Sequence, residues 1–350
     1  MAGLNIELLE ATSVVGSAWR SHYDRLHLHT PKSASALPGL AMPAAWPMYP
    51  TRDQVVDYLE SYRACHGLLP HYGQRVIRLE CHGDKWHATT AECEWRARNV
   101  VVATGATRQP VRPTWPGFGS FQGPVVHSSE YHNGMGWKGQ SVLVIGFGNS
   151  ACEIAIDLDE SGAHPHLAVR SPVNVIPRDV LGVVPVLQLG ILMRRLPVRV
   201  ADALAWPIIR LSIGDIRKSG LRKLPYGPNT QIARDRHIPL LDIGTMSRIR
   251  EGRIAVHGDI DRFTPNSVVF TSGEVLAVAA VVMATGFRPA LEDFLVDWPD
   301  VCDRDGVPLV SGAPTGIRGL YFCGQYVSPA GMLREIGIEA RRIASRIAAA

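Results

Sequence analysis

Residues 141–171 hold the feature that most restricts how this chain can fold. An apolar, β-branched run at 142–145 predicts a buried parallel strand. Gly146, Gly148 and Ala151 follow it at G-x-G-x-x-A spacing, and a helical stretch begins at Ala151. Small residues at these steps allow a tight turn, a close backbone approach to a pyrophosphate and close packing of helix on strand. The stretch predicts a dinucleotide-binding unit, with a glycine-rich turn in another kind of α/β domain as the alternative.

A second short strand, predicted at 166–169, ends at Arg170. At this position an NAD-binding chain usually carries Asp or Glu, whereas an arginine suits the extra phosphate of NADP. The N-terminal amides and the dipole of the helix at 151–160 would face the phosphates. Strand, glycine turn, helix and Arg170 together predict a site for a nicotinamide dinucleotide.

Composition limits the class of protein and its partners. With 350 residues, 46% of them apolar and 19% charged, the chain is long enough for two domains and has the balance of an ordinary globular protein. Its net charge of +4 includes no dense Lys/Arg run, which favours anionic small molecules over nucleic acid as partners. The six cysteines show no C-x-x-C pair. We therefore expect neither a metal site nor a redox dithiol, and a reducing cytosol is the default location.

The longest apolar stretch, 180–193, is interrupted by two glycines and a proline. It is shorter than the roughly 20 residues that cross a bilayer, and the N-terminal residues show no secretory signal. We expect a cytoplasmic protein without a transmembrane segment, in which 180–193 forms a buried or lid-like helix. Loose attachment to a membrane surface is the alternative. We also expect a mostly apolar pocket lined from residues 180–215.

The N-terminal part of the chain predicts a second α/β region. A strand at 5–10 ends in Glu10, an acid at the position that usually hydrogen-bonds a ribose in a dinucleotide fold. A Pro-rich irregular loop at 37–50 precedes a helix at 51–65 with Thr51 as its N-cap. A meander of strands is predicted after the helix, at 76–79, 85–89 and 95–102.

Two strands end in the same tripeptide, Ala-Thr-Gly, at 103–105 and 284–286. Their placement around one nucleotide-binding unit predicts an α/β fold with two nested dinucleotide-binding, Rossmann-like domains. The inner domain would bind NADPH and span 110–285, with a helical insertion at about 178–220. The outer domain would be discontinuous, made of residues 1–109 and 286–350.

The outer domain would close with a strand at 319–324 and a helix at 329–349. The N-terminus of this helix would offer its positive dipole to an electron-accepting ring beside Gly324. A strand–turn–helix that only closes the sheet is the alternative.

A motif between the two Ala-Thr-Gly segments carries the most specific resemblance. Phe121, Gly123, His127 and Tyr131 follow the pattern F-x-G-x-x-x-H-x-x-x-Y, which resembles that of flavin-containing monooxygenases and, in variant form, of Baeyer–Villiger monooxygenases. Residues 221–254 are similar to the YUCCA-type branch, the indole-3-pyruvate monooxygenases. Further stretches that resemble the family lie at 9–19, 23–31, 49–62 and 319–325.

The resemblance implies two dinucleotide-binding domains, one for FAD and one for NADPH, and an FAD- and NADPH-dependent monooxygenase. NADPH would reduce FAD, the reduced flavin would capture dioxygen as a C4a-(hydro)peroxide, and one oxygen would pass to a small organic substrate. The cofactor would carry the difficult step while the protein orients it and excludes water. The branch points to an aryl pyruvate or a similar 2-oxo acid.

The resemblance also implies site residues. His127 and Tyr131 would lie at the domain junction near NADP, help to position it, and are the candidate catalytic residues. The implied FAD-binding residues are Glu10 at the adenosine ribose, Trp19 and Arg20 at the pyrophosphate and ring, Val76 at adenine, and Gly105 and Gly324 in the crevice. The implied NADPH-binding residues are Gly146, Gly148, Asn149, Ser150, Ala151 and Arg170. The remaining candidate cofactor-binding residues are Thr104, Phe121, Gly123, Ala284, Thr285, Gly286 and Gln325.

One departure from the family pattern affects the flavin site. Family members begin with a strand and a G-x-G-x-x-G helix that cradle the FAD pyrophosphate, and the sequence shows no such unit before Glu10. Its absence would leave two sheet edges unpaired. We expect a misassigned start or a truncated chain; a degraded gene product and a chain that binds flavin differently are the alternatives.

Two other functions stay open at the level of sequence. One is an NADPH-dependent flavoprotein oxidase or reductase, although the missing C-x-x-C argues against a disulfide reductase. The other is a non-catalytic remnant that binds NADP at 146–170 and carries no flavin.

Overall fold

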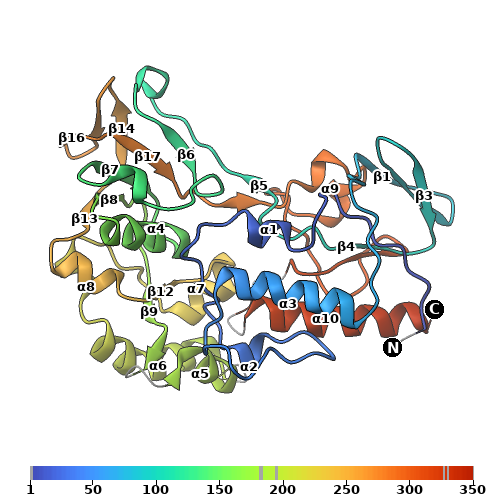
Figure 1. Cartoon of the computed structure of the whole chain (residues 1–350). Coiled ribbons are helices and arrows are strands. Elements are labelled where there is room, and N and C mark those ends of the chain that lie inside the picture. The colour runs from blue at the N-terminus through green and yellow to red at the C-terminus, as the bar shows by residue number, and fades with distance from the viewer. Residues whose placement is uncertain (1–2, 181–183, 194–195, 326–327, 329–330, 350) are drawn as a thin grey trace. The chain divides into compact units, whose positions relative to one another are not determined.

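The computed structural model describes residues 3–180, 184–193, 196–325, 328 and 331–349, and it divides into two compact units (Figure 1). Unit 1 comprises Met1–Arg20, Pro31–Pro110 and Phe287–Ala350, and unit 2 comprises Ser21–Thr30 and Val111–Gly286. Both units mix helices and strands, which confirms the predicted α/β class.

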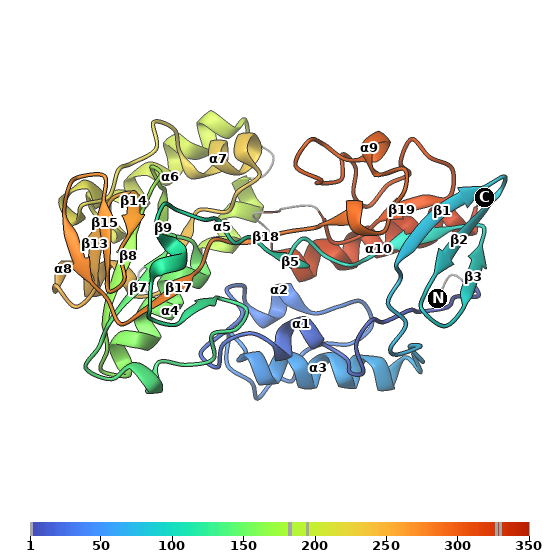
Figure 2. The same cartoon turned by 90° about the horizontal axis from the view of Figure 1, so that it is seen from above.

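A five-stranded parallel sheet forms the centre of unit 2 (Figure 2). Its central β7 and β8 have the side-chain pattern of strands covered on both faces, and Val142, Leu143 and Val144 are fully buried. These two strands confirm the predictions at 142–145 and 166–169 to within two residues. In sheet order the strands are β13 (Ala255–His257), β8 (His164–Ala168), β7 (Ser141–Ile145), β17 (Ala280–Met283) and β6 (Val125–His127).

Helix α4 (Asn149–Glu160) packs on this sheet through a face that includes Ile154 and Leu158, both fully buried. The predicted helix is confirmed, and it begins two residues earlier than expected. A small antiparallel sheet packs against the core around Phe263. Its strands are β14 (Ile260–Phe263), β15 (Ser267–Phe270) and β16 (Val275–Ala277).

The rest of unit 2 consists of short strands and helices. The helix predicted over 180–193 is confirmed only over 186–193, as α5. Val180 and Val184–Pro185 instead belong to the paired strands β10 and β11, and residues 181–183 lie outside the described part. No helix among the described residues is long and apolar enough to cross a membrane. The elements are η1 (Phe118–Ser120), η2 (Met135–Trp137), β9 (Val175–Pro177), β10 (Asp179–Val180), β11 (Val184–Pro185), α5 (Val186–Met193), α6 (Val198–Ser212), η3 (Ile216–Ser219), α7 (Pro228–Asp235), β12 (Leu240–Asp242) and α8 (Thr245–Arg250).

Unit 1 is built from helices and three small sheets. The predicted N-cap of α3 is confirmed: Thr51 Oγ1 accepts a hydrogen bond from Gln54 N, and Gln54 Oε1 accepts one from Thr51 N. The elements are α1 (Ser17–Arg20), α2 (Lys32–Ser35), α3 (Arg52–Cys65), β1 (Arg78–His82), β2 (Lys85–Thr89), β3 (Glu94–Ala97), β4 (Val100–Val102), β5 (Gln109–Pro110), β18 (Phe287–Arg288), η4 (Leu291–Asp293), α9 (Trp298–Val301), β19 (Leu320–Phe322) and α10 (Met332–Ala348).

The single strand predicted at 95–102 is wrong, because the structure contains two strands there. β3 closes the antiparallel sheet β1-β2-β3, whereas β4 pairs in parallel with β19 in another sheet. Only Arg98 and Asn99 separate the two strands, and neither is a glycine or a proline, so the sequence pattern hides the change of partner.

The strand predicted at 5–10 is also reduced, to one bridge between Leu9 and His71. Ile6 is 64% exposed and Leu8 is 44% exposed, so among the described residues no partner strand covers this segment. The closing helix α10 begins at Met332, and residues 329–330 of its predicted start lie outside the described part.

Candidate functional site

The turn after β7 has the shape that its glycines predict. Gly146 has φ +128°, and a Cβ placed on it would lie 2.5 Å from Ala284 O, so a side chain is excluded. Gly148 has extended backbone, and a Cβ there would meet nothing within 4 Å. Helix α4 begins directly after it, and no side chain caps its first amides. The turn thus places backbone amides beside open space at the positive end of a helix.

The side chains of Asn149 and Ser150 are held by the protein. Asn149 Oδ1 accepts a hydrogen bond from Leu241 N at 2.9 Å, which ties the start of α4 to β12. Ser150 forms a hydrogen bond with the hydroxyl of Tyr23. Burial of Tyr23, reinforced by the nearby Glu153 carboxylate, raises the pKa of the Tyr23 phenol well above its ordinary value. These two contacts fix the side chains at the start of α4 and leave the backbone amides of the same residues directed along the helix axis.

Arg170 is exposed two residues beyond the C-terminal end of β8, and it has a cationic neighbour that sequence spacing did not reveal. The Arg222 guanidinium donates to the Arg170 carbonyl oxygen, although the two residues are 52 positions apart. Hydrogen bonds between Val173 N and Arg222 O and between Leu224 N and Val173 O hold the two segments together. Two guanidinium groups at one strand end make a suitable site for a phosphate.

Two residues of the 121–131 motif, Phe121 and Gly123, pack within the protein. Phe121 packs against Phe263 with ring centroids 5.8 Å apart. A Cβ on Gly123 would lie 2.4 Å from Ala279 O, so the backbone just before β6 approaches the residue before β17 too closely for a side chain. These two positions fix where β6 enters the sheet.

His127 lies at the end of β6 and is fully buried. Its Nε2 lies 3.1 Å from Gly286 O and its Nδ1 lies 2.9 Å from Ser129 Oγ. Burial lowers the pKa of His127, so the imidazole is neutral near neutral pH. The ring therefore links the turn after β6 to the segment after β17.

Tyr131 is also buried, and its hydroxyl donates to Asp157 Oδ2 of α4 at 2.5 Å. Its ring stacks on Trp137 with centroids 5.5 Å apart and an interplanar angle of 9°. Burial, reinforced by Asp157, raises the pKa of the phenol, so it stays protonated. Tyr131 thus connects the motif to the helix that follows the glycine turn.

The second Ala-Thr-Gly segment lies beside the same turn. Ala284 O lies against Gly146, as described above, and Thr285 Oγ1 donates to Val111 O at 2.5 Å. Gly286 has φ +88°, with nothing within 4 Å of a Cβ placed on it. The structure therefore brings together the glycine turn, His127 and residues 284–286 within unit 2.

In unit 1 the turn after β19 depends on a carboxylate that sequence reasoning missed. Glu339 of α10 is 3% exposed, and its Oε2 accepts hydrogen bonds from Gly324 N at 2.7 Å and from Ser311 Oγ at 2.9 Å. Ser311 Oγ in turn accepts a hydrogen bond from Gln325 N at 3.3 Å. Gln325 is 4% exposed, and neither polar atom of its side chain has a hydrogen-bond partner in the part of the chain that the structure describes. A buried amide without a partner is costly, and here it marks a place for a polar ligand.

The N-terminal candidates of unit 1 are engaged locally. Glu10 Oε1 accepts hydrogen bonds from the amide and hydroxyl of Thr12, at 2.8 Å and 2.7 Å. The Arg20 guanidinium forms an ion pair with Glu60 at 2.9 Å. The others are spread over unit 1: Trp19 lies in α1, Val76 packs at the edge of the unit 1 core, Thr104 is exposed after β4, and Gly105 has φ +75°.

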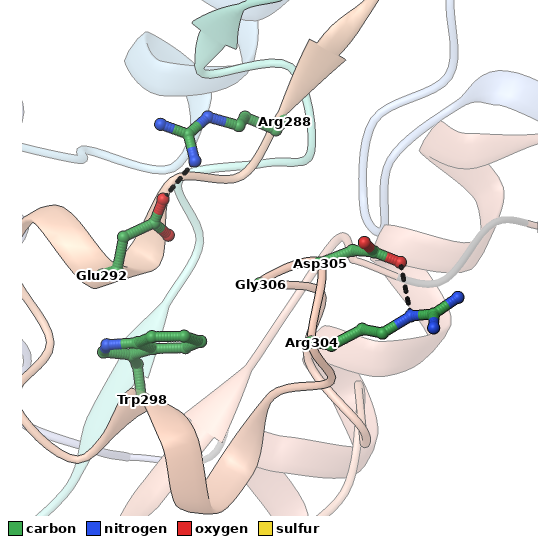
Figure 3. Close-up of a pocket in the computed structure, with 6 residues that line it drawn as sticks. All are labelled: Arg288, Glu292, Trp298, Arg304, Asp305 and Gly306. Atoms are coloured by element: carbon green, nitrogen blue, oxygen red, sulfur yellow. Dashed lines mark hydrogen bonds and ion pairs between the residues drawn. The ribbon is translucent and has the colours of Figure 1, made fainter.

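A cavity of about 440 Å³ in unit 1 contains none of the predicted site residues (Figure 3). Arg288 and Glu292 pair across its wall at 2.5 Å, and the Trp298 ring lies below them. The remaining lining residues are Arg304, Asp305 and Gly306.

Comparison with known proteins places this architecture in a family. The family model for flavin-binding monooxygenase-like proteins matches residues 11–300. The chain belongs to this family. As a flavin-binding monooxygenase-like protein it is a flavin-dependent monooxygenase, and the resemblance predicted from the 121–131 motif is confirmed.

This flavin-dependent monooxygenase is similar to indole-3-pyruvate monooxygenase YUCCA4 of Oryza sativa subsp. japonica, with 35% identity over 342 residues that cover 93% of this chain and 78% of the relative. Its fold is similar to that of a flavin-containing monooxygenase from Stenotrophomonas maltophilia, with a TM-score of 0.72, 23% identity and coverage of 99% and 92%. It is also similar to cyclohexanone monooxygenase from Rhodococcus sp. Phi1 bound to NADP+, with a TM-score of 0.71, 17% identity and coverage of 98% and 80%.

Proposed function

We propose that this flavin-dependent monooxygenase uses FAD and NADPH to oxygenate an aryl 2-oxo acid. The observation that carries the NADPH assignment is the turn at Gly146 and Gly148, where backbone amides at the start of α4 lie beside open space. Arg170 and Arg222, at the end of the next strand, supply cations for the 2′-phosphate that distinguishes NADPH from NADH. Unit 2 is accordingly the proposed NADPH-binding domain.

Unit 1 is the proposed FAD-binding domain, and its turn at Gly324 and Gln325 fits a flavin. A flavin ring presents both carbonyl oxygens and an N–H at its edge. The Gln325 amide offers the complementary donor and acceptor, both buried and without a partner among the described residues. Gly324 has φ +80°, and Glu339 holds its amide in place. When bound, the flavin supplies the activation of dioxygen with electrons from NADPH.

The protein's own residues then bind, orient and exclude water. The amides at the start of α4 hold the NADPH pyrophosphate. The neutral, buried His127 fixes the backbone at Gly286, and Tyr131 fixes α4 through Asp157. We propose that both act by positioning the dinucleotide, because neither side chain has a free polar edge that solvent can reach.

The substrate class rests on the relatives named as indole-3-pyruvate monooxygenases. Oxygenation of a 2-oxo acid beside its keto carbon releases carbon dioxide and leaves the carboxylic acid shortened by one carbon. One dioxygen and one NADPH are consumed, and the second oxygen atom leaves as water.

The experiment combines a spectrum with a product balance. The purified protein is incubated with FAD and freed of unbound FAD by gel filtration, and its visible spectrum is recorded. NADPH oxidation is then followed with indole-3-pyruvate, with phenylpyruvate and without substrate. We expect flavin absorption bands and one shortened acid per NADPH with the aryl substrates. Formation of one hydrogen peroxide per NADPH consumed, without the shortened acid, would instead favour a flavoprotein oxidase. NADP binding without bound flavin would favour the non-catalytic remnant.

A further inference from the structure

Helix α6 (Val198–Ser212) exposes an apolar stripe on the surface of unit 2. Val200 is 45% exposed, Leu204 is 53% exposed and Leu211 is 85% exposed. Their spacing of four and seven residues places them on one face of the helix. An adjacent face, about 100° around the helix axis from the stripe, is the one packed in the protein, since Ala201 and Ala205 are buried. The three large apolar residues of the stripe therefore point outward, while the buried positions of the helix carry alanine, the reverse of an ordinary surface helix.

Positive charge and an exposed indole flank the stripe. Arg199, Trp206 and Arg210 repeat at intervals of seven and four residues along the neighbouring face, and all three are exposed. Trp206 is 57% exposed. Aromatic and basic side chains beside an apolar stripe are typical of helices that lie in the interface of a membrane.

The single acid of α6 faces the other way. Asp202 Oδ1 accepts a hydrogen bond from Asn229 N at 2.8 Å, and its Oδ2 accepts one from Thr230 N at 3.1 Å. The carboxylate thus caps the start of α7, which lies beside α6 (Figure 2). The outward face consequently combines apolar and cationic groups with no carboxylate from the helix.

We propose that α6 attaches unit 2 to an anionic lipid surface, with Leu204 and Leu211 inserted among the acyl chains and Arg199 and Arg210 at the headgroups. The helix lies in the plane of the interface and does not span it, in keeping with its length of 15 residues. A second copy of the chain fits this face less well, because a two-fold contact would bring the arginines of the two copies together. The inference does not depend on the proposed reaction.

The test is flotation of the FAD-loaded full chain with vesicles of phosphatidylcholine alone or mixed with phosphatidylglycerol. We expect binding to the mixed vesicles that weakens with added salt. The double variant Leu204→Gln/Leu211→Gln should bind at least about tenfold more weakly, because affinity scales with the apolar area inserted. The double variant Arg199→Gln/Arg210→Gln should bind the mixed vesicles about tenfold more weakly than the parent, and its binding to phosphatidylcholine alone should be unchanged. Leu69→Gln, at an 81% exposed leucine of unit 1, is the matched control and should bind like the parent.

Several outcomes overturn the inference. One is no flotation with either vesicle; another is equal flotation of the parent and the leucine double variant. A dimer in light scattering that the leucine double variant dissociates would show that a second copy covers the stripe. A lower melting temperature of that variant without vesicle binding would show that the protein itself covers it.

Discussion

Replacing Glu339 by alanine should destabilise unit 1 far more than the loss of a surface carboxylate. The substitution removes the acceptor of the buried Gly324 amide, and a hydrogen bond to a charged group contributes about 1.5–3 kcal/mol. The Ser311 hydroxyl loses a partner as well, but it can still donate to Phe322 O, so its loss is smaller. We expect the free energy of unfolding to fall by about 2–4 kcal/mol.

The assay is equilibrium urea unfolding, combined with hydrogen–deuterium exchange of peptides that cover residues 311–325. Local protection there should fall by about a hundredfold, since each 1.4 kcal/mol corresponds to about a factor of ten. Glu60→Ala is the matched control: its carboxylate pairs with Arg20 on the surface, where such a pair contributes at most about 1 kcal/mol. Equal stabilities of the two variants, or unchanged exchange at 311–325, would refute the role given to Glu339.

Three further predictions concern unit 2. Alanine at Arg170 or Arg222 should raise KM for NADPH about tenfold or more and leave KM for NADH unchanged. The reason is that each guanidinium contributes a charge-assisted hydrogen bond to the 2′-phosphate, which NADH lacks. Equal increases in KM for both dinucleotides would contradict this. Tyr131→Phe should lower the melting temperature, because about 1 kcal/mol of hydrogen bonding is lost. It should change kcat less than about threefold, because the ring stacking is kept. A lower kcat with an unchanged melting temperature would show that the phenol is catalytic. Burial, with the neighbouring His257, lowers the pKa of His166 to about 4. Its folded pKa lies below the unfolded value, so its contribution to stability is full above about pH 6.5 and is lost as the pH falls toward 4, by up to about 3 kcal/mol. His166→Gln should flatten the urea stability profile over that interval, and an unchanged slope would refute it.

Local patterns predicted the parts of this fold that local chemistry determines. The strand before Gly146, the glycine turn and α4 follow each other directly in sequence, so their signals are contiguous. The N-cap of α3 at Thr51 is equally local. Both were predicted correctly because no distant partner is needed to form them.

The features that sequence reasoning missed depend on distant partners. Arg222 lies beside Arg170 only because a bridge joins Val173 to Lys223. Glu339 reaches Gly324 because α10 runs back along the strand that precedes it. In the same way, the change of sheet within 95–102 follows from the arrival of β19 beside β4, and no local pattern encodes that pairing.

The pairing of β4 with β19 has a consequence during protein synthesis. β4, which begins at Val100, cannot pair until β19, which begins at Leu320, has been synthesised. Among the described residues β4 pairs with no other strand. At ribosomal rates of about 5–20 residues per second, that interval lasts roughly 10–40 s. The larger segment of unit 2, Val111–Gly286, is made in the meantime. The nascent chain therefore carries an open strand edge while unit 2 is completed, and we expect the interval between synthesis of Val100 and of Leu320 to be the period in which chaperones determine its yield.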